Sequence, residues 1–122
     1  MIIDERRFVV AVTGGRDFNH IDFIYKTMNE VNIKYDVYEY VFGDAHGVDA
    51  HVQKWVIENK LNHKKYYADW GFHGKSAGPI RNKQILDECR PNLLIAFPGG
   101  RGTANMVIQA RRRGVPIMIC LQ

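Results

Sequence analysis

The sequence is poor in cysteine and contains no long hydrophobic run. Its two cysteines, Cys89 and Cys120, belong to no CxxC motif and build no disulfide framework, so both are expected to be reduced, buried thiols of a cytoplasmic protein. No apolar stretch approaches the roughly 18 residues that a transmembrane helix requires, and no membrane association is expected. The segment Met1 to Arg7 is mostly charged and lacks the apolar centre of a secretory signal.

Metal ligands and covalent nucleophiles are equally scarce. No two histidines have the i,i+4 spacing of a helical metal site, and the chain has neither a Cys/His cluster nor a GxSxG motif. We therefore predict no metal site, no covalent nucleophile and no resident cofactor. The five histidines are His20, His46, His51, His63 and His73.

What remains is an ordinary globular composition with a mild basic excess. The 122 residues are 46% apolar and 25% charged, which predicts one folded domain over residues 1–122. The formal net charge of +4 favours anionic partners without naming one. The most basic run, Arg111 to Arg113, is expected at a helix C-terminus, where cations complement the helix dipole; a nucleic-acid patch is the alternative.

Apolar runs alternate with amphipathic stretches along the whole chain, which predicts an α/β fold. Strands are predicted at residues 8–12, 38–42, 65–68, 93–97 and 116–121. Four helical patterns lie between them, with apolar faces that include Ile21, Val48, Ile80 and Met106 in turn. We predict a Rossmann-like, three-layer domain whose five-stranded, mainly parallel sheet has helices on both faces. Residues 69–78 hold three glycines and are predicted to form a mobile surface loop.

Two glycine-rich loops follow the first and fourth predicted strands. In the strand order 3-2-1-4-5 these strands are neighbours, and such sheets bind ligands between the carboxyl ends of these two strands. Adjacent glycines can expose backbone N–H groups, a helix N-terminus adds partial positive charge, and arginine offers a planar fork for phosphate oxygens. We therefore predict a phosphate site, with Arg16 and Arg101 facing one ligand from two sides. The two segments are Gly14-Gly15-Arg16-Asp17 and Pro98-Gly99-Gly100-Arg101-Gly102-Thr103.

An acidic loop, beginning with Gly43 and Asp44, follows the second predicted strand. Asp44 is placed to accept a ribose hydroxyl. Asp49 falls in the first turn of the next helix, where either ligand contact or a favourable interaction with the helix dipole explains a carboxylate. The sequence leaves that choice open.

A third group of candidates surrounds Pro79, which suits the first position of a helix. Arg81 and Asn82 would then lie in the first helical turn, close to the crevice, although a solvated helix start is an equal interpretation. Trp70, in the predicted loop, could stack on a base or serve as a partly buried hinge residue. Neither glycine-rich loop is a Walker A or a GxGxxG motif, so a standard nucleotide fingerprint is absent.

Taken together and in this order, these motifs resemble the YpsA-related branch of the SLOG superfamily. The resemblance covers nearly the whole chain, from Phe8 to about Leu121. It implies a Rossmann-like fold and a nucleotide-derived small molecule as ligand. Relatives include the LOG phosphoribohydrolases, which cleave the N-glycosidic bond of nucleoside monophosphates, and the DNA-processing DprA proteins.

The LOG motif Pro-Gly-Gly-x-Gly-Thr-x-x-Glu is matched from Pro98 to Thr103, and Arg81 falls where the resemblance implies a catalytic arginine. The glutamate position is occupied by Met106, which can neither transfer a proton nor stabilise a cation. Asp44 or Asp49 would have to replace that carboxylate. A ligand sensor is therefore our first interpretation, an N-glycosidic hydrolase the second and a single-stranded DNA binder the third. Nucleic acid is not the expected partner, and the oligomeric state, a homo-oligomer included, stays open because no interface can be identified.

Overall fold

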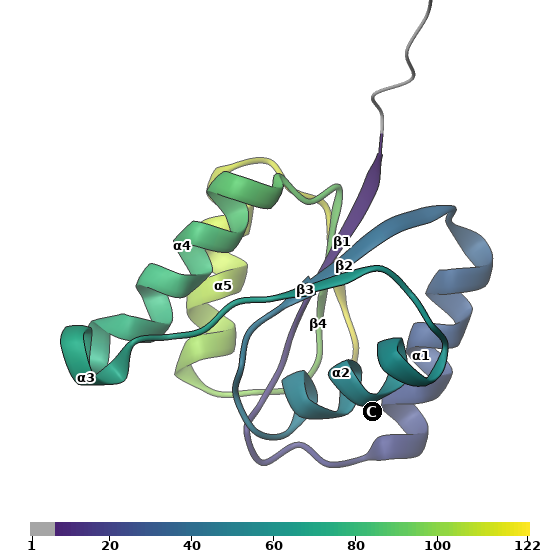
Figure 1. Ribbon diagram of the computed structural model, residues 1–122, viewed down its shortest axis with the longest axis horizontal. Helices are drawn as coiled ribbons and strands as arrows, with labels where there is room; N and C mark the ends of the chain where they lie inside the picture. Colours follow the sequence, from purple (N-terminus) through teal and green to yellow (C-terminus); the bar gives the residue numbers. More distant parts are fainter. Residues whose placement is uncertain (1–6) are drawn as a thin grey trace, which may run out of the picture.

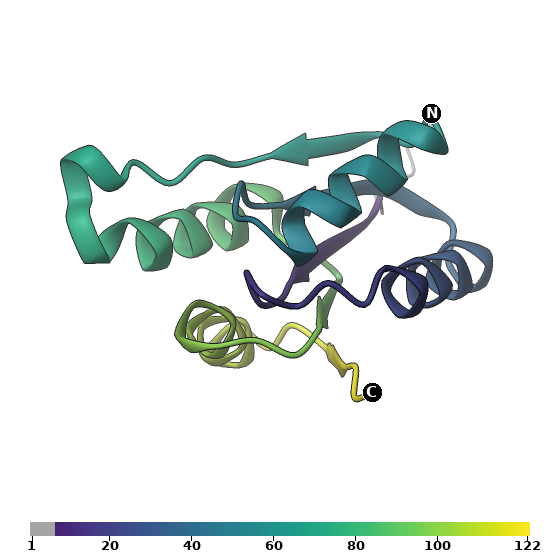
Figure 2. The same cartoon turned by 90° about the horizontal axis from the view of Figure 1, so that it is seen from below.

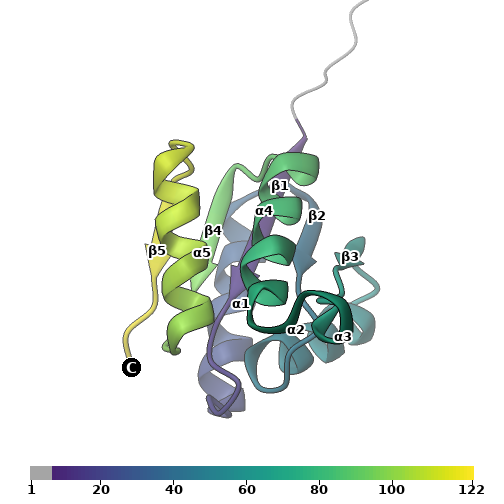
Figure 3. The same ribbon diagram turned by 90° about the vertical axis from the view of Figure 1, so that its left-hand side faces the viewer.

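Five parallel strands form one sheet in the order β3-β2-β1-β4-β5, as the sequence predicted (Figures 1 and 3). The computed structural model describes residues 7–122, so residues 1–6, where no secretory signal is expected, lie outside the description. The strands are β1 (Phe8–Thr13), β2 (Val37–Phe42), β3 (His63–Lys65), β4 (Leu93–Ala96) and β5 (Ile117–Ile119). The helices are α1 (Ile21–Lys34), α2 (Val48–Glu58), α3 (Trp70–His73), α4 (Ala77–Cys89) and α5 (Arg101–Arg112), with a 3-10 turn η1 (Gly74–Ser76) between α3 and α4.

Alternate residues of β1 feed two separate cores, one on each face of the sheet. Val10 and Val12 pack with the buried faces of α1 and α2, whereas Val9 and Ala11 pack with those of α4 and α5. A strand buried on both faces must be apolar at every position, which explains the continuous apolar run of β1. Figure 3 shows α4 and α5 in front of the sheet and the fainter α1 and α2 behind it. The predicted three-layer α/β architecture is confirmed.

The carboxyl ends of β1 and β4 lie side by side. Their parallel register pairs Thr13 with Ala96, so the two glycine-rich loops leave the sheet next to each other. At one end of the molecule, α3 lies beside the start of α4, far from α1 (Figures 1 and 2). No helix within residues 7–122 has both the length and the apolar character needed to cross a membrane.

The segment 69–78 is not a loop, contrary to the prediction from its glycines. Asp69 caps α3 by accepting a hydrogen bond of 3.1 Å from the backbone N–H of Phe72. Gly74 then ends α3 with a φ of 58°, a conformation in which glycine carries no steric penalty. The glycines therefore punctuate short helical turns.

Several boundaries also differ from the predicted ones, and two of them bear on the site. β3 ends at Lys65 because its partner β2 ends at Phe42, although the N–H of Tyr66 still donates to the Phe42 carbonyl at 2.8 Å. α4 starts at Ala77, so Pro79 is its third residue and Arg81 lies in the second turn, not the first. Proline is tolerated there because the first four N–H groups of a helix have no intrahelical partner. The placement of the run 111–113 at the C-terminus of α5 is confirmed.

Candidate functional site

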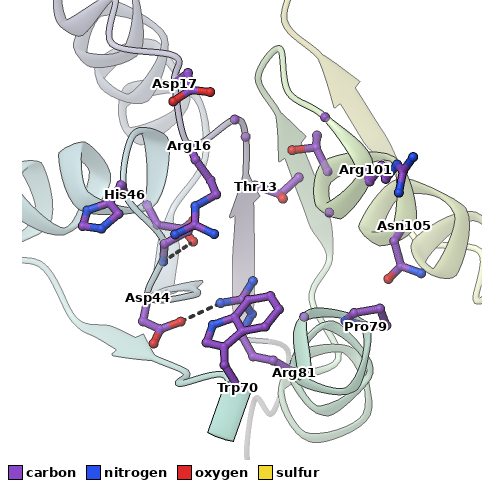
Figure 4. Close-up of a pocket in the computed structure, with 18 of the residues that line it drawn as sticks. Thr13, Arg16, Asp17, Asp44, His46, Trp70, Pro79, Arg81, Arg101 and Asn105 are labelled. Carbon is purple, nitrogen blue, oxygen red and sulfur yellow. Dashed lines mark hydrogen bonds and ion pairs between the residues drawn. The ribbon is translucent and has the colours of Figure 1, made fainter. Parts of the chain in front are cut away.

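A cavity of about 700 Å³ opens at the carboxyl edge of the sheet (Figure 4). Its volume falls in the range of about 300–1,000 Å³ that is typical of small-molecule sites. The sequence-predicted residues that line it are Gly14, Gly15, Arg16, Asp17, Asp44, Asp49, Arg81, Gly100, Arg101, Gly102 and Thr103. Four other predicted site residues do not line it: Gly43, Asn82, Pro98 and Gly99.

Several of the glycines serve the packing of loops against one another. The N–H of Gly15 donates to the Pro98 carbonyl at 2.8 Å and is therefore not available to a ligand. A Cβ on Gly14 would overlap the side chain of Val48, and one on Gly99 would overlap Thr103. The first Gly-Gly pair thus brings three loops together. The N–H of Gly15, which we expected to bind phosphate, bonds the Pro98 carbonyl instead.

The free amides are at the start of α5. Its N-cap residue, Gly100, provides no side-chain cap. Within residues 7–122 the N–H groups of Arg101, Gly102 and Thr103 donate to no protein group, whereas that of Ala104 bonds the Gly100 carbonyl at 3.0 Å. These residues border the cavity. An exposed helix N-terminus of this kind is suited to a phosphate or carboxylate.

Basic side chains surround the cavity unevenly. Arg16 is exposed and extends over the centre of the site in Figure 4, while Asp17 lies at its outer edge. Arg101 lines the cavity but points away from Arg16 and Arg81, so it does not face the ligand space as we predicted (Figure 4). Lys75, from η1, adds a positive charge that the sequence analysis did not identify.

Asp44 and Arg81 form an ion pair on the cavity wall. Arg81 Nη1 donates to Asp44 Oδ1 at 2.7 Å, and the same oxygen accepts from the Ala68 backbone N–H at 3.3 Å. The side chains are 21% and 11% exposed for Asp44 and Arg81 respectively. Gly43 contributes indirectly, because a Cβ at that position would overlap the guanidinium of Arg81. The arginine is thus held in one orientation beside the ligand space.

Asp49 lies behind this pair as a buried carboxyl. It is 6% exposed, and its Oδ2 accepts a hydrogen bond of 3.1 Å from the backbone N–H of Ala45. Burial raises the pKa of Asp49 to about 6, while the nearby Arg81 lowers it. The sequence left ligand contact and an interaction with the helix start open; the structure shows a further role, in which this carboxylate holds the β2–α2 loop through Ala45, and it also places Asp49 in the cavity wall.

Asn82 supports the site from outside. It is 4% exposed, and its Nδ2 donates at 3.2 Å both to the Gly102 carbonyl and to Asn105 Oδ1. These bonds tie α4 to the first turns of α5. Asn105 lines the cavity, and its position one helical turn after Arg101 is a spacing from which it could have been identified.

Met106, at the position of the LOG glutamate, is 1% exposed and packs in the core between the sheet and α4 and α5. The cavity wall therefore gains no carboxylate from that position. The remaining wall residues are Trp70, for which the sequence left base stacking and a hinge role open, and five that were not among the predicted site residues: Thr13, Ala45, His46, Gly78 and Pro79. Most lie at or after the ends of strands or belong to the segment 69–78, which was predicted to be a loop because of its three glycines. Within residues 7–122, no three His, Cys, Asp or Glu side chains converge on a point that could hold a metal ion.

The amino-acid sequence is similar to those of known proteins. Residues 8–73, more than half of the chain, match the family described as YAcAr, the YspA, cpYpsA-related SLOG family. The Gene 61 protein of Mycobacterium phage D29 is 31% identical over 85 residues, which cover 64% of this chain and 67% of that protein. The family match runs from β1 to α3 and so includes the first Gly-Gly loop, Asp44 and Trp70.

Proposed function

This chain belongs to the YspA, cpYpsA-related SLOG family, and we propose that its cavity binds a phosphorylated, nucleotide-derived small molecule. The proposal rests chiefly on one observation: three backbone N–H groups at the start of α5 are unpartnered within residues 7–122 and border a cavity of ligand size. Unpaired amides at a helix N-terminus favour a bound anion, because they supply both donors and the positive end of the helix dipole.

Charge and shape support a nucleotide-like ligand. Arg16 and Lys75 add positive charge to the walls, and within residues 7–122 neither forms an ion pair. Asp44 uses only Oδ1 for Arg81 and Ala68, which leaves Oδ2 for a ribose hydroxyl. A phosphate at α5 and a sugar near Asp44 would occupy one continuous cavity.

The test is a thermal-shift panel of inorganic phosphate, nucleoside mono-, di- and triphosphates, ADP-ribose and dinucleotides. A compound present at ~100 times its Kd stabilises the folded state by about 2.7 kcal/mol, which is readily visible as a higher Tm. Calorimetric titration of each stabilising compound then compares Arg16→Ala with Arg112→Ala. Arg112 is an exposed arginine at the far end of α5 and serves as the matched control.

We expect Arg16→Ala to weaken binding about ten- to hundredfold, because a charge-assisted hydrogen bond is worth about 1.5–3 kcal/mol. Arg112→Ala should leave the affinity unchanged. A panel in which no compound moves the Tm would refute the proposal, and equal affinities in both variants would place the anion elsewhere.

Cleavage of the N-glycosidic bond is a second candidate function, favoured by the carboxyl of Asp49 in the cavity wall. With a pKa of about 6, this group could exchange a proton near neutral pH. The sensor proposal predicts little free base when nucleoside monophosphates are incubated with the protein. Turnover of about 1 per second or faster, abolished by Asp49→Asn, would favour the hydrolase instead.

A further inference from the structure

The two tryptophans of the chain occupy contrasting environments. Trp55 is 1% exposed, its Nε1 donates to Asn29 Oδ1 at 2.8 Å, and its ring meets Tyr40 edge-on with centroids 5.2 Å apart. Trp70 is 50% exposed, and within residues 7–122 its indole has no hydrogen bond and no aromatic partner. Core packing and a hydrogen bond therefore account for the position of Trp55, whereas neither accounts for the exposed indole of Trp70.

Trp70 is nevertheless held in a defined place. It is the first residue of α3, whose N-cap Asp69 accepts from Phe72 through its side chain and from the N–H of His73 through its carbonyl at 2.9 Å. The edge of the indole lies against α4 at Gly78, where an added Cβ would be 3.4 Å from the ring atom Cη2. The ring therefore contacts the start of α4 through its edge, and both Trp70 and Gly78 line the cavity.

We propose that Trp70 is the stacking platform for the base of a nucleotide ligand, an inference that rests on the function proposed above. In Figure 4 the indole lies beside the Asp44–Arg81 pair and away from Arg101 at the start of α5. A phosphate bound at α5 and a ribose at Asp44 would thus direct the base toward Trp70. Lys75, in the adjoining turn η1, lines the same cavity.

This arrangement specifies a class of ligand. Every base has a π-face, so an unpaired aromatic ring recognises bases without choosing among them. The ligand class is therefore a nucleoside phosphate, bound more tightly than the corresponding sugar phosphate that lacks a base.

The experiment compares AMP, GMP, CMP, UMP and ADP-ribose with ribose 5-phosphate, by calorimetry, on the wild-type protein and two variants. Trp70→Leu keeps apolar bulk and removes the stacking face, whereas Trp70→Phe keeps an aromatic ring. We expect Trp70→Leu to weaken nucleotide binding about ten- to hundredfold, the range of base–aromatic stacking, and to leave ribose 5-phosphate unaffected. Trp70→Phe should retain most of the affinity.

Fluorescence provides an independent readout because the chain has only two tryptophans. Nucleotides should change the emission of the wild-type protein but not that of Trp70→Phe, in which only the buried Trp55 remains. The inference is overturned if Trp70→Leu binds nucleotides as tightly as wild type. It is also overturned if the variant loses nucleotide and ribose 5-phosphate affinity equally with a lower Tm, which would mark a packing role. In the first case binding itself, and hence the proposed function, survives; if no compound binds the wild-type protein, both fall.

Discussion

At the scale of single residues, the cavity depends on charged groups that the fold has partly removed from water. Asp44 and Arg81 compensate each other at 2.7 Å, whereas Asp49 is more deeply buried and is stabilised in its ionised form by the nearby charge of Arg81 and by the backbone N–H of Ala45. Burial disfavours the ionised carboxyl, so the folded state holds a proton on Asp49 at a pH where the unfolded chain has released it. The pH dependence of the free energy of unfolding should therefore contain a contribution from Asp49.

The pKa of Asp49 is about 6 when folded, against an ordinary value of 3.8. Its contribution to stability is present at low pH and is lost as the pH rises from about 4 to 6, after which it is constant. Asp49→Asn has no such titration and can still accept the Ala45 hydrogen bond. Relative to wild type, the variant should gain about 2–3 kcal/mol of unfolding free energy between pH 4 and pH 7.

Urea denaturation at a series of pH values measures this difference. Asp17→Asn, at an exposed position on the edge of the same cavity, is the matched control. If the difference in unfolding free energy between Asp49→Asn and wild type does not change with pH, the carboxyl of Asp49 is hydrated in the folded protein.

At the scale of elements, the site is created by connections between strands and helices that pack directly against one another. Gly47, the residue before α2, has φ 72° and ψ −126°, and a Cβ there would overlap the backbone carbonyl of Gly15. The N–H of Val48 donates to that same carbonyl at 3.2 Å. The start of α2 is therefore seated on the first glycine-rich loop, and the position of Arg16 depends on that contact.

Gly47→Ala and Gly114→Ala separate this contact from the cost of backbone conformation. Both glycines have φ of 72°, but an added Cβ at Gly114 meets nothing within 4 Å. We expect Gly114→Ala to cost about 1–2 kcal/mol of stability from its conformation alone, and Gly47→Ala to cost at least ~2 kcal/mol more. Chemical denaturation gives both values; similar losses would mean that the loops can separate without penalty.

At the scale of the whole molecule, the sheet divides the apolar interior into two clusters, one under α1 and α2 and one under α4 and α5. The cavity draws its walls from both halves, since α2 contributes Asp49 and α4 contributes Arg81. Both halves draw alternate residues from the same two strands, β1 and β4, so we expect them to unfold together as one cooperative domain.

Two probes on opposite faces test this cooperativity. In a variant that carries Trp70→Phe and Cys120→Ala, the fluorescence reports Trp55, which lies in the first cluster, while thiol labelling reports Cys89, which packs against the second. Burial raises the pKa of the Cys89 thiol, so it should react slowly until the protein unfolds. Both probes should give the same urea midpoint; separate midpoints would show that the layers are independent units.

The order and type of most elements followed from the sequence, and the physical reason is local. A strand buried on both faces needs consecutive apolar residues, so β1 and β4 could be predicted from their own letters, and two parallel neighbours place the loops that follow them at one edge. Arg16 was predicted for this reason, Asp44 from the loop after the second strand and Arg81 from the helix start around Pro79; all three line the cavity.

What only the tertiary structure decided is which group each side chain meets. The sequence could not show that the Gly15 amide is taken by Pro98, that Asn82 bonds α5 instead of the cavity, or that Arg101 points away from Arg16. Trp70 was predicted to lie in a loop, because the residue pattern did not reveal the hydrogen bond by which Asp69 caps the turn that follows it. Such contacts depend on distances between segments far apart in the chain or on the closure of a single turn, and a pattern of residue types along the chain specifies neither.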